Sequence, residues 1–313
     1  MRTVFLGTSE FAAAVLHRLA DSPHTPVLVV TKPDRPRGRG RHLASPPVAA
    51  LARALGLDLD QPASVNSADA RRRIASVAPD VVCVCAFGAL IAEPLLSAHP
   101  MLNVHPSLLP RWRGAAPIER AIMAGDTRTG VSIMRLAAGL DDGPVGPCVA
   151  EPIGSADTFA SLSTRLQVVG AELLVRFLDE PEPMREQADQ GVTYAEKIGA
   201  SDRLLDPSRP AVELERTVRA LHPHVGAHVP LGDRTLLGVQ GAALSSPGEA
   251  ADASSAGSTG SARGTPPLYA DGDRLLLCCA PGLLELLVVQ PPGRRPMAAA
   301  DFLRGRGLPR SPV

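Results

Sequence analysis

Apolar and polar residues follow one another along the first half of the chain in a pattern that predicts alternating strands and helices. The predicted strands are short apolar runs at residues 3–6, 26–30, 80–86, 101–104 and 131–136. The predicted helices are segments with apolar residues at helical spacing, at residues 9–19, 47–55, 116–124 and 157–178. Apart from Asp80, the run 80–86 is continuously apolar, which is typical of a strand buried on both faces. Strands that alternate with helices predict an α/β domain with a doubly wound, mostly parallel sheet.

The second half of the chain has a different pattern. After a predicted helix at 210–221, short apolar runs separated by Gly-Asp and Pro-Gly turns predict strands at residues 227–231, 234–239, 274–277 and 283–289. Closely spaced strands of this kind favour a small antiparallel β-barrel. The segment 245–266 is rich in Ser, Ala and Gly, and we expect it to be a flexible surface loop.

The change of pattern places the domain boundary between Gln187 and Asp206. We therefore expect a first domain at residues 1–190, a linker at 191–206 and a barrel domain at 207–313 that carries the flexible insert.

The length and composition allow one large or two ordinary folded domains and limit the possible partners. Hydrophobic residues make up 45% of the 313 residues and aromatic residues only 3%, so the cores are aliphatic. Lys and Arg total 32, and Asp and Glu also total 32. Because the chain has no net charge, a nucleic-acid partner would have to be held by local basic patches.

The sequence favours a protein of the cytoplasm. The N-terminus turns polar too early for a signal peptide, and no apolar run reaches the roughly 18 to 20 residues that span a bilayer, so no membrane partner is expected. The five cysteines lack zinc-site spacing, and Cys83 and Cys85 lie in a predicted strand. Buried free thiols fit a reducing compartment.

Residues 103–117 contain the strongest candidates for catalytic side chains. Asn103 and His105 lie two residues apart at the end of a predicted strand, so their side chains point to the same face, and Pro106 ends the strand. An amide donor and an imidazole aimed together suit stabilisation of an oxyanion with proton transfer. Taken alone, the pair is better explained as an ordinary polar strand end.

The whole string from Asn103 to Pro117 resembles the folate-site motif of the methionyl-tRNA formyltransferases, and the resemblance extends over nearly the whole chain. It implies a Rossmann-like formyltransferase domain followed by an OB-like β-barrel domain that binds tRNA. It also implies transfer of a formyl group from 10-formyltetrahydrofolate to the α-amino group of methionyl initiator tRNA.

The same resemblance implies roles for individual residues. The catalytic set would be Asn103, His105 and Asp141, the last from the Gly139-Leu140-Asp141 loop. In the family that loop usually continues as Thr-Gly-Asp, whereas this chain has Asp142-Gly143-Pro144. Without the resemblance, Asp141 is better explained as a turn residue. The residues implied in folate binding are Phe87, Gly88, Leu90, Ile91, Ser107, Leu108, Leu109 and Pro110.

A basic segment near the N-terminus is the candidate RNA contact. Its cationic residues are Lys32, Arg35, Arg37, Arg39 and Arg41. Interspersed Gly and Pro are expected to keep the segment out of helix and sheet, and guanidinium groups can bind phosphates bidentately. A solvated surface loop explains the segment equally well, but the resemblance favours tRNA contact, with Arg39 as the foremost candidate.

Two other functions remain as alternatives. A folate-dependent formyltransferase could act on a small amine such as glycinamide ribonucleotide or an amino sugar, and a non-catalytic RNA-binding protein is the second alternative. The glycinamide class is expected to carry a Gly/Ser/Asn-rich phosphate loop after the first strand, which Gly7-Thr8-Ser9-Glu10 does not match. No DNA partner is expected. No metal is expected either, because the His222–His228 segment contains Pro223 and lacks a fourth ligand.

Overall fold

The computed structural model describes residues 1–37, 42–231, 235–245 and 268–305. The chain forms two compact units. Unit 1 comprises Met1–Pro117, Arg128–Pro152 and Ser163–Glu196, and unit 2 comprises Ile118–Thr127, Ile153–Leu162 and Lys197–Val313.

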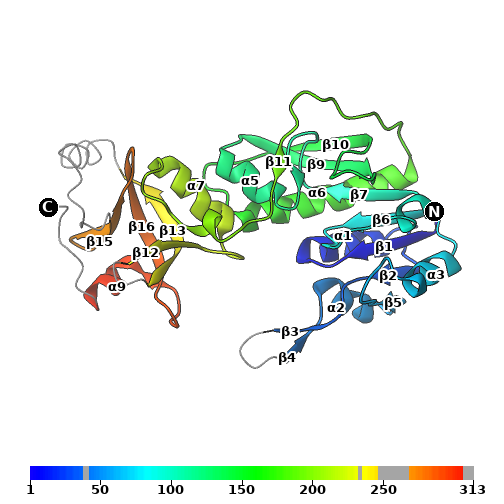
Figure 1. Cartoon of the computed structure of the whole chain (residues 1–313), viewed down its shortest axis with the longest axis horizontal. Helices are drawn as coiled ribbons and strands as arrows, with labels where there is room; N and C mark the ends of the chain where they lie inside the picture. Colours follow the sequence, from blue (N-terminus) through cyan, green and yellow to red (C-terminus); the bar gives the residue numbers. More distant parts are fainter. Residues whose placement is uncertain (38–41, 232–234, 246–267, 306–313) are drawn as a thin grey trace. The chain divides into compact units, whose positions relative to one another are not determined.

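Unit 1 is built on a seven-stranded sheet with the strand order β10-β9-β7-β6-β1-β2-β5 (Figure 1). Its strands are β1 (Thr3–Gly7), β2 (Leu28–Val30), β5 (Leu59–Asp60), β6 (Val81–Cys85), β7 (Met101–His105), β9 (Arg128–Arg135) and β10 (Val145–Pro152). The pairs from β7 across to β5 are parallel, whereas β9 is antiparallel to both β7 and β10. The predicted mostly parallel α/β fold is thus confirmed, with an antiparallel edge.

Helices connect the parallel strands. They are α1 (Glu10–Ala20), α2 (Pro47–Ala54), α3 (Ala68–Ser76) and α4 (Leu95–Ala98), and the longer α6 (Phe159–Asp179) follows β10. Ser9 caps α1, since its side chain accepts a hydrogen bond from the Ala12 N–H, as its position before the apolar stripe predicts. The strands β1 and β6 are buried at every residue. The loops that follow the carboxyl ends of these strands are therefore anchored on a well-packed core.

The basic segment forms a hairpin, which corrects the expectation that Gly and Pro keep it out of a sheet. The strands β3 (Arg35–Arg37) and β4 (His42–Ala44) pair in antiparallel register, with Pro36 opposite Leu43. A two-stranded hairpin has only edge strands, and an edge strand tolerates the missing N–H of proline. Arg39 and Arg41 lie outside the described residues.

Unit 2 contains an antiparallel sheet with the order β12-β13-β16-β15-β14, and β17 pairs with β16. Its strands are β12 (Ala227–Pro230), β13 (Leu236–Leu244), β14 (Leu268–Asp271), β15 (Arg274–Cys278), β16 (Leu283–Gln290) and β17 (Met297–Ala298). The helices α7 (Ala211–Leu221) and α9 (Ala299–Arg304) cover its aliphatic core, and α5 (Pro117–Ala124) lies almost wholly in this unit. The curled antiparallel sheet confirms the predicted OB-like second domain. Most of the insert expected at 245–266 lies outside the described residues.

Two short strands complete unit 1: β8 (Arg113–Gly114) pairs in parallel with β11 (Tyr194–Ala195). A single 3₁₀ turn, η1 (Ser201–Arg203), follows in unit 2. Among the helices of the described ranges, none combines the length and the apolar character that crossing a membrane requires.

Candidate functional site

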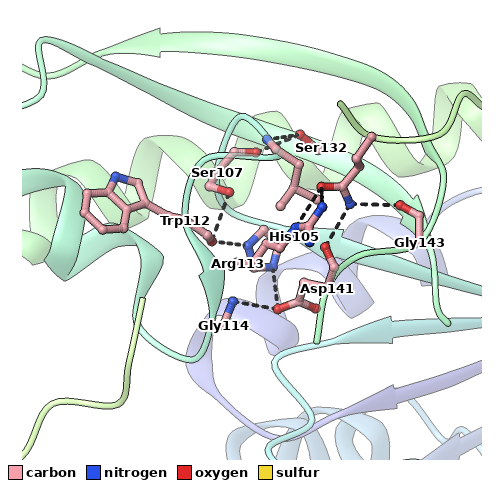
Figure 2. A network of polar contacts seen from close by, with 10 residues as sticks. His105, Ser107, Trp112, Arg113, Gly114, Ser132, Asp141 and Gly143 are labelled. Carbon is pink, nitrogen blue, oxygen red and sulfur yellow. Dashed lines mark hydrogen bonds and ion pairs between the residues drawn. The ribbon is translucent and has the colours of Figure 1, made fainter. Parts of the chain in front are cut away.

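His105 ends strand β7 and is nearly enclosed, with 3% of its surface exposed. Its Nε2 atom lies 2.8 Å from the carbonyl oxygen of Trp112 (Figure 2). Because a carbonyl oxygen only accepts hydrogen bonds, Nε2 carries a proton. The Nδ1 atom is therefore the nitrogen that remains for chemistry.

The backbone of Trp112 is held in place to receive that hydrogen bond. Trp112 has a φ of +64°, an uncommon conformation for a bulky residue. Its N–H donates to the Thr193 hydroxyl at 3.0 Å, and the Ser107 hydroxyl donates to its carbonyl oxygen at 3.3 Å. Strained backbone that is fixed by its surroundings concentrates at functional sites, so this turn fits the positioning of His105.

Asp141 approaches His105 from the loop that follows β9. Its Oδ2 atom lies 3.8 Å from His105 Nδ1, and 14% of its side chain is exposed. The same oxygen accepts a hydrogen bond from the Gly114 N–H at 2.8 Å. Gly114 has a φ of +115°, and a Cβ there would lie 2.8 Å from the Ala195 carbonyl oxygen, so only glycine fits. The structure thus brings together an imidazole and a carboxylate from loops about 36 residues apart in sequence.

Gln187 holds the Asp141 loop in place through hydrogen bonds to its backbone. Its Nε2 atom donates to the carbonyl oxygens of Asp141 and Gly143, both at 2.8 Å. Its Oε1 atom accepts from the Arg113 guanidinium at 2.9 and 3.0 Å. These bonds join the loop to the segment that carries Gly114, and they hold Asp141 at its φ of +48°. Gln187 carries no local sequence signal, so sequence reasoning did not find it.

Replacing Gln187 with leucine should lower kcat by up to about 10²-fold and leave the KM values nearly unchanged. The reason is that an apolar side chain releases the Asp141 loop, and a misplacement near 1 Å at a reacting group costs about that much. Steady-state kinetics with thermal unfolding checks this. Gln167→Leu is the matched control, because Gln167 bonds only the Ser163 hydroxyl among the described residues. Equal kcat values for the two variants would contradict a positioning role for Gln187.

Asn103 lies on β7 two residues before His105 and is half-buried, between Val84 on β6 and Met134 on β9. The alternation of the strand gives both side chains the same face. No hydrogen-bonding partner for the Asn103 carboxamide is found among the described residues. Its donor is therefore available to a ligand, while the structure gives it no direct contact with His105 or Asp141.

The segment from Ser107 to Pro110 lies against β9. Ser107 is fully buried, and its carbonyl oxygen accepts a hydrogen bond from the Ser132 hydroxyl at 2.7 Å. The Leu109 N–H donates to the same hydroxyl at 3.3 Å. The Leu108 side chain covers Gly130, where a Cβ would lie 2.6 Å from Leu108 Cδ2 and 2.2 Å from the Val149 carbonyl oxygen.

Gly130→Ala should therefore destabilise the protein by about 1–3 kcal/mol, because the added methyl group overpacks a fixed backbone contact. Urea unfolding of the full chain measures the change. Gly305→Ala serves as the control, since its Cβ would meet nothing closer than 3.8 Å. A Gly130→Ala variant as stable as Gly305→Ala would show that β9 and β10 separate easily at this point.

The loop after β6, Phe87 to Ile91, is fixed by three side chains from other segments. The Thr8 hydroxyl donates to the Phe87 carbonyl oxygen at 2.8 Å, and the Lys32 ammonium donates to the Gly88 carbonyl oxygen. Asn66 donates to the Leu90 carbonyl oxygen at 2.8 Å and accepts from the Ala92 N–H at 3.0 Å. Leu90 itself is 78% exposed, so its side chain is available to a bound molecule.

The predicted tRNA-binding residues occupy different surroundings. Lys32 is half-buried against Gly88, whereas Arg35 is exposed on β3 and Arg37 continues that strand. Arg39 and Arg41 lie outside the described residues. Sequence reasoning missed Thr8 and Asn66, whose roles depend on contacts with a loop far away in the chain.

No group of three or more His, Cys, Asp and Glu side chains suited to a metal occurs in the part of the chain that the structure describes. A cavity of about 730 Å³ lies in unit 2, but its lining includes no residue of the His105–Asp141 cluster. The chemical groups at the end of β7, and not that cavity, define the candidate site.

Comparisons with protein families match both parts of the chain. Residues 1–178 match the model described as "Formyl transferase", and residues 197–307 match "Formyl transferase, C-terminal domain". A methionyl-tRNA formyltransferase of Pseudomonas paraeruginosa is 43% identical over 98% of this chain and 96% of its own length. The corresponding protein of Halorhodospira halophila is 41% identical over 100% of this chain and 99% of its own.

Solved structures with low identity share the fold. The sugar 3N-formyl transferase WlaRD superposes with a TM-score of 0.64 at 13% identity, over 94% of this chain and 99% of that one. HypX from Aquifex aeolicus gives a TM-score of 0.61 at 15% identity. The match covers 100% of this chain, which spans about half of HypX, 51% of its length.

Proposed function

The chain belongs to the methionyl-tRNA formyltransferase family, and we propose that it transfers a formyl group from 10-formyltetrahydrofolate to the α-amino group of methionyl initiator tRNA. The observation that carries the assignment of the site is the enclosed His105 imidazole, whose Nδ1 atom faces Asp141 Oδ2 at 3.8 Å. Asn103 on the same strand supplies a second polar group.

Formyl transfer needs charge stabilisation and one proton movement. The amine nitrogen forms a bond to the formyl carbon, and the carbonyl electrons move to its oxygen. The Asn103 carboxamide and a protonated His105 Nδ1 donate hydrogen bonds to this oxyanion. The bond from the carbon to N10 of the folate then breaks, N10 gains a proton and the amine loses one.

Asp141 accounts for the proton movement. Its Oδ2 atom is fixed by the Gly114 N–H and lies next to His105 Nδ1. The carboxylate accepts a proton from the attacking amine through water and returns it towards N10. The Trp112 carbonyl oxygen keeps the other His105 nitrogen protonated throughout, so a single nitrogen faces the reaction.

The folate donor is proposed to lie between two segments at the strand ends. Phe87, Gly88, Leu90 and Ile91 follow β6, and the Ser107–Pro110 segment follows β7. Open α/β sheets bind ligands at the carboxyl ends of their strands. The backbone groups of the first loop are held by Thr8, Lys32 and Asn66, which suits recognition of a flat ring edge.

The acceptor is proposed to reach the site past the β3–β4 hairpin. Arginine occupies every second position of the sequence from Arg35 to Arg41, and the first two of these residues belong to β3. Guanidinium groups bind RNA phosphates and make the interaction sensitive to salt.

The direct test incubates the purified protein with charged initiator tRNA and a formyl-folate labelled in the formyl group. Acid-stable label in formyl-methionine on the tRNA supports the proposal. Labelling of a small amine such as glycinamide ribonucleotide, and not of the tRNA, would favour the small-amine alternative. Normal tRNA binding without any transfer would identify a non-catalytic RNA-binding protein.

A further inference from the structure

Unit 2 contains a groove, called the edge groove below, that the catalytic set, the folate segments and the basic hairpin do not use. It is the cavity of about 730 Å³, and all the residues that line it belong to unit 2. Its walls come from α7, from residues 125–127 and 153–156, and from the end of β13. Helix α7 packs beside β13 in this unit (Figure 1).

Strand β13 turns an unpaired edge towards the groove. β12 pairs only with residues 236–239, so residues 240–244 continue past the end of β12, while their other side pairs with β16. All five of these residues line the groove. Because side chains alternate along a strand, a cavity under one face would be lined by every second residue. Five consecutive lining residues indicate that the strand edge itself faces the cavity.

The exposed edge is suited to pairing with a further strand. Within the described ranges, the backbone groups of residues 240–244 have no hydrogen-bond partner except in β16. Their sequence, Gln-Gly-Ala-Ala-Leu, has no charge and no proline, which are the usual means of blocking such an edge. The small side chains at its centre leave room for a second backbone.

Two polar groups of the groove also await a partner. The Arg216 guanidinium lies directly over Gly125, and it makes no hydrogen bond or ion pair with any residue that the structure describes. Arg219, one turn further along α7, is by contrast neutralised by Glu215 at 2.6 Å. His222 Nδ1 is buried without a hydrogen-bond partner in the same part of the chain. Buried polar atoms are normally paired, so these groups fit a bound molecule that carries an anion.

We propose that the edge groove binds an extended segment of another protein, which adds a strand to β13 and places a carboxylate beside Arg216. Addition of a strand to a sheet edge is a general mode of peptide recognition, in which backbone hydrogen bonds supply affinity and side-chain contacts supply specificity. The inference concerns a protein partner and goes beyond formyl transfer.

The neighbouring apolar side chains indicate the remaining chemistry of that segment. Val212, Leu244 and Leu287 line the groove and are exposed. Exposed apolar groups that gather at a concave surface mark interaction sites. Val212 and Arg216 lie four residues apart on α7 and so share one face of the helix. The bound segment is therefore expected to carry apolar and acidic side chains on one strand face.

Other occupants fit the groove less well. A twofold contact along this edge between two copies of the chain would bring two Arg216 guanidinium groups to one interface, and like charges repel. RNA would need several cations for its phosphates, whereas the groove is largely apolar and also contains the acidic residues Asp126 and Glu215.

The probe for the test is the fluorescein-labelled peptide Glu-Ser-Val-Ser-Val-Ser-Glu. In an extended chain its valines and glutamates lie on one face, so that a carboxylate reaches Arg216 in either direction of pairing. The matched peptide has glutamine in place of both glutamates. Fluorescence anisotropy with the full chain should give the glutamate peptide a Kd at least about tenfold below that of the glutamine peptide.

Arg216→Met should abolish this preference, so that both peptides bind equally. Arg304→Met is the matched control, because it removes a guanidinium from an exposed ion pair on α9 in the same unit, and it should behave as the unaltered protein. Thermal unfolding of both variants shows whether the fold is intact.

Backbone pairing is tested separately, with the unaltered protein. Successive N–H groups of a strand point alternately to its two sides, so an added strand turns only every second N–H towards β13. One peptide carries N-methyl groups on two serine nitrogens, and another carries them on the two valine nitrogens. One of them should lose affinity by at least about tenfold, and the other should bind as the unmodified peptide does. Hydrogen exchange at the amides of residues 240–244 should slow when the unmodified peptide is added.

The contrary outcomes are equally specific. Absence of binding by the glutamate peptide, or equal affinity of the two N-methylated peptides, would overturn strand addition at this edge. A higher tRNA KM in Arg216→Met with unchanged peptide binding would show that the groove contacts RNA. Slow exchange at residues 240–244 that appears with rising protein concentration alone, together with a dimer mass, would assign the edge to a second copy of the chain.

Discussion

Replacing His105 with alanine should lower kcat for formyl transfer by about 10²-fold to 10³-fold, because the oxyanion loses one of its two donors. The imidazole is enclosed, and only its Nδ1 atom faces the reacting groups. A water molecule that replaced it would have to leave bulk solvent for a buried site, which costs free energy. Asn103→Ala should produce a loss of similar size, since the carboxamide is the second donor. Single-turnover rates at saturating donor and tRNA measure both effects.

Folding controls keep this result interpretable. His17→Ala removes the same side chain from the exposed face of α1 and should retain full activity. Thermal unfolding of His105→Ala shows whether loss of the hydrogen bond to the Trp112 carbonyl oxygen disturbs the turn. Near-normal turnover in both His105→Ala and Asn103→Ala would remove these residues from the catalytic set.

Asp141→Asn should lower kcat by about 10²-fold to 10⁴-fold, because the amide keeps the shape of the side chain and loses the proton acceptor. The amide oxygen can still accept from the Gly114 N–H, so the loop should stay in place. The KM values for both substrates should therefore change little, and steady-state kinetics with each substrate varied in turn measures both parameters.

The neighbouring residue provides a matched control for that change. Asp142→Asn alters the same loop by the same chemical step, but Asp142 is exposed and its carboxylate lies over Gly139. It should retain normal turnover. Equal losses in the two variants would indicate a general effect of loop charge instead of proton transfer by Asp141.

The sequence predicts the parallel strands β1, β2, β6 and β7, because each contains a run of apolar residues. The two-residue strand β5 (Leu59–Asp60) was not predicted, since it is too short to show such a run. The run 80–86 contains β6, and residues 101–104 contain most of β7. The antiparallel edge is harder to predict. Strand β10 contains Gly146 and Pro147, and polar and apolar residues do not alternate regularly along its sequence. The prediction that the basic segment lies outside any sheet was wrong. Pairing of Arg35–Arg37 with His42–Ala44 outweighs the local tendency of Pro36 to avoid strands.

Some site residues can likewise be found from local sequence spacing, whereas others depend on contacts between distant segments. Asn103 and His105 are close in sequence and share one strand face, so their spacing alone suggests a joint role. Asp141 is suggested only by the resemblance of its loop to a family motif, because no local pattern shows that it meets His105. Gln187 and Asn66 act on backbone carbonyl groups of distant loops, and such contacts leave no trace in residue spacing.

The most direct test of the account is a crystal structure with an unreactive analogue of 10-formyltetrahydrofolate that keeps the formyl carbonyl group. The account predicts that the carbonyl oxygen lies about 3 Å from both Asn103 Nδ2 and His105 Nδ1. It also predicts that Asp141 lies on the side from which the amine enters. A carbonyl oxygen bound out of reach of both donors would contradict the account.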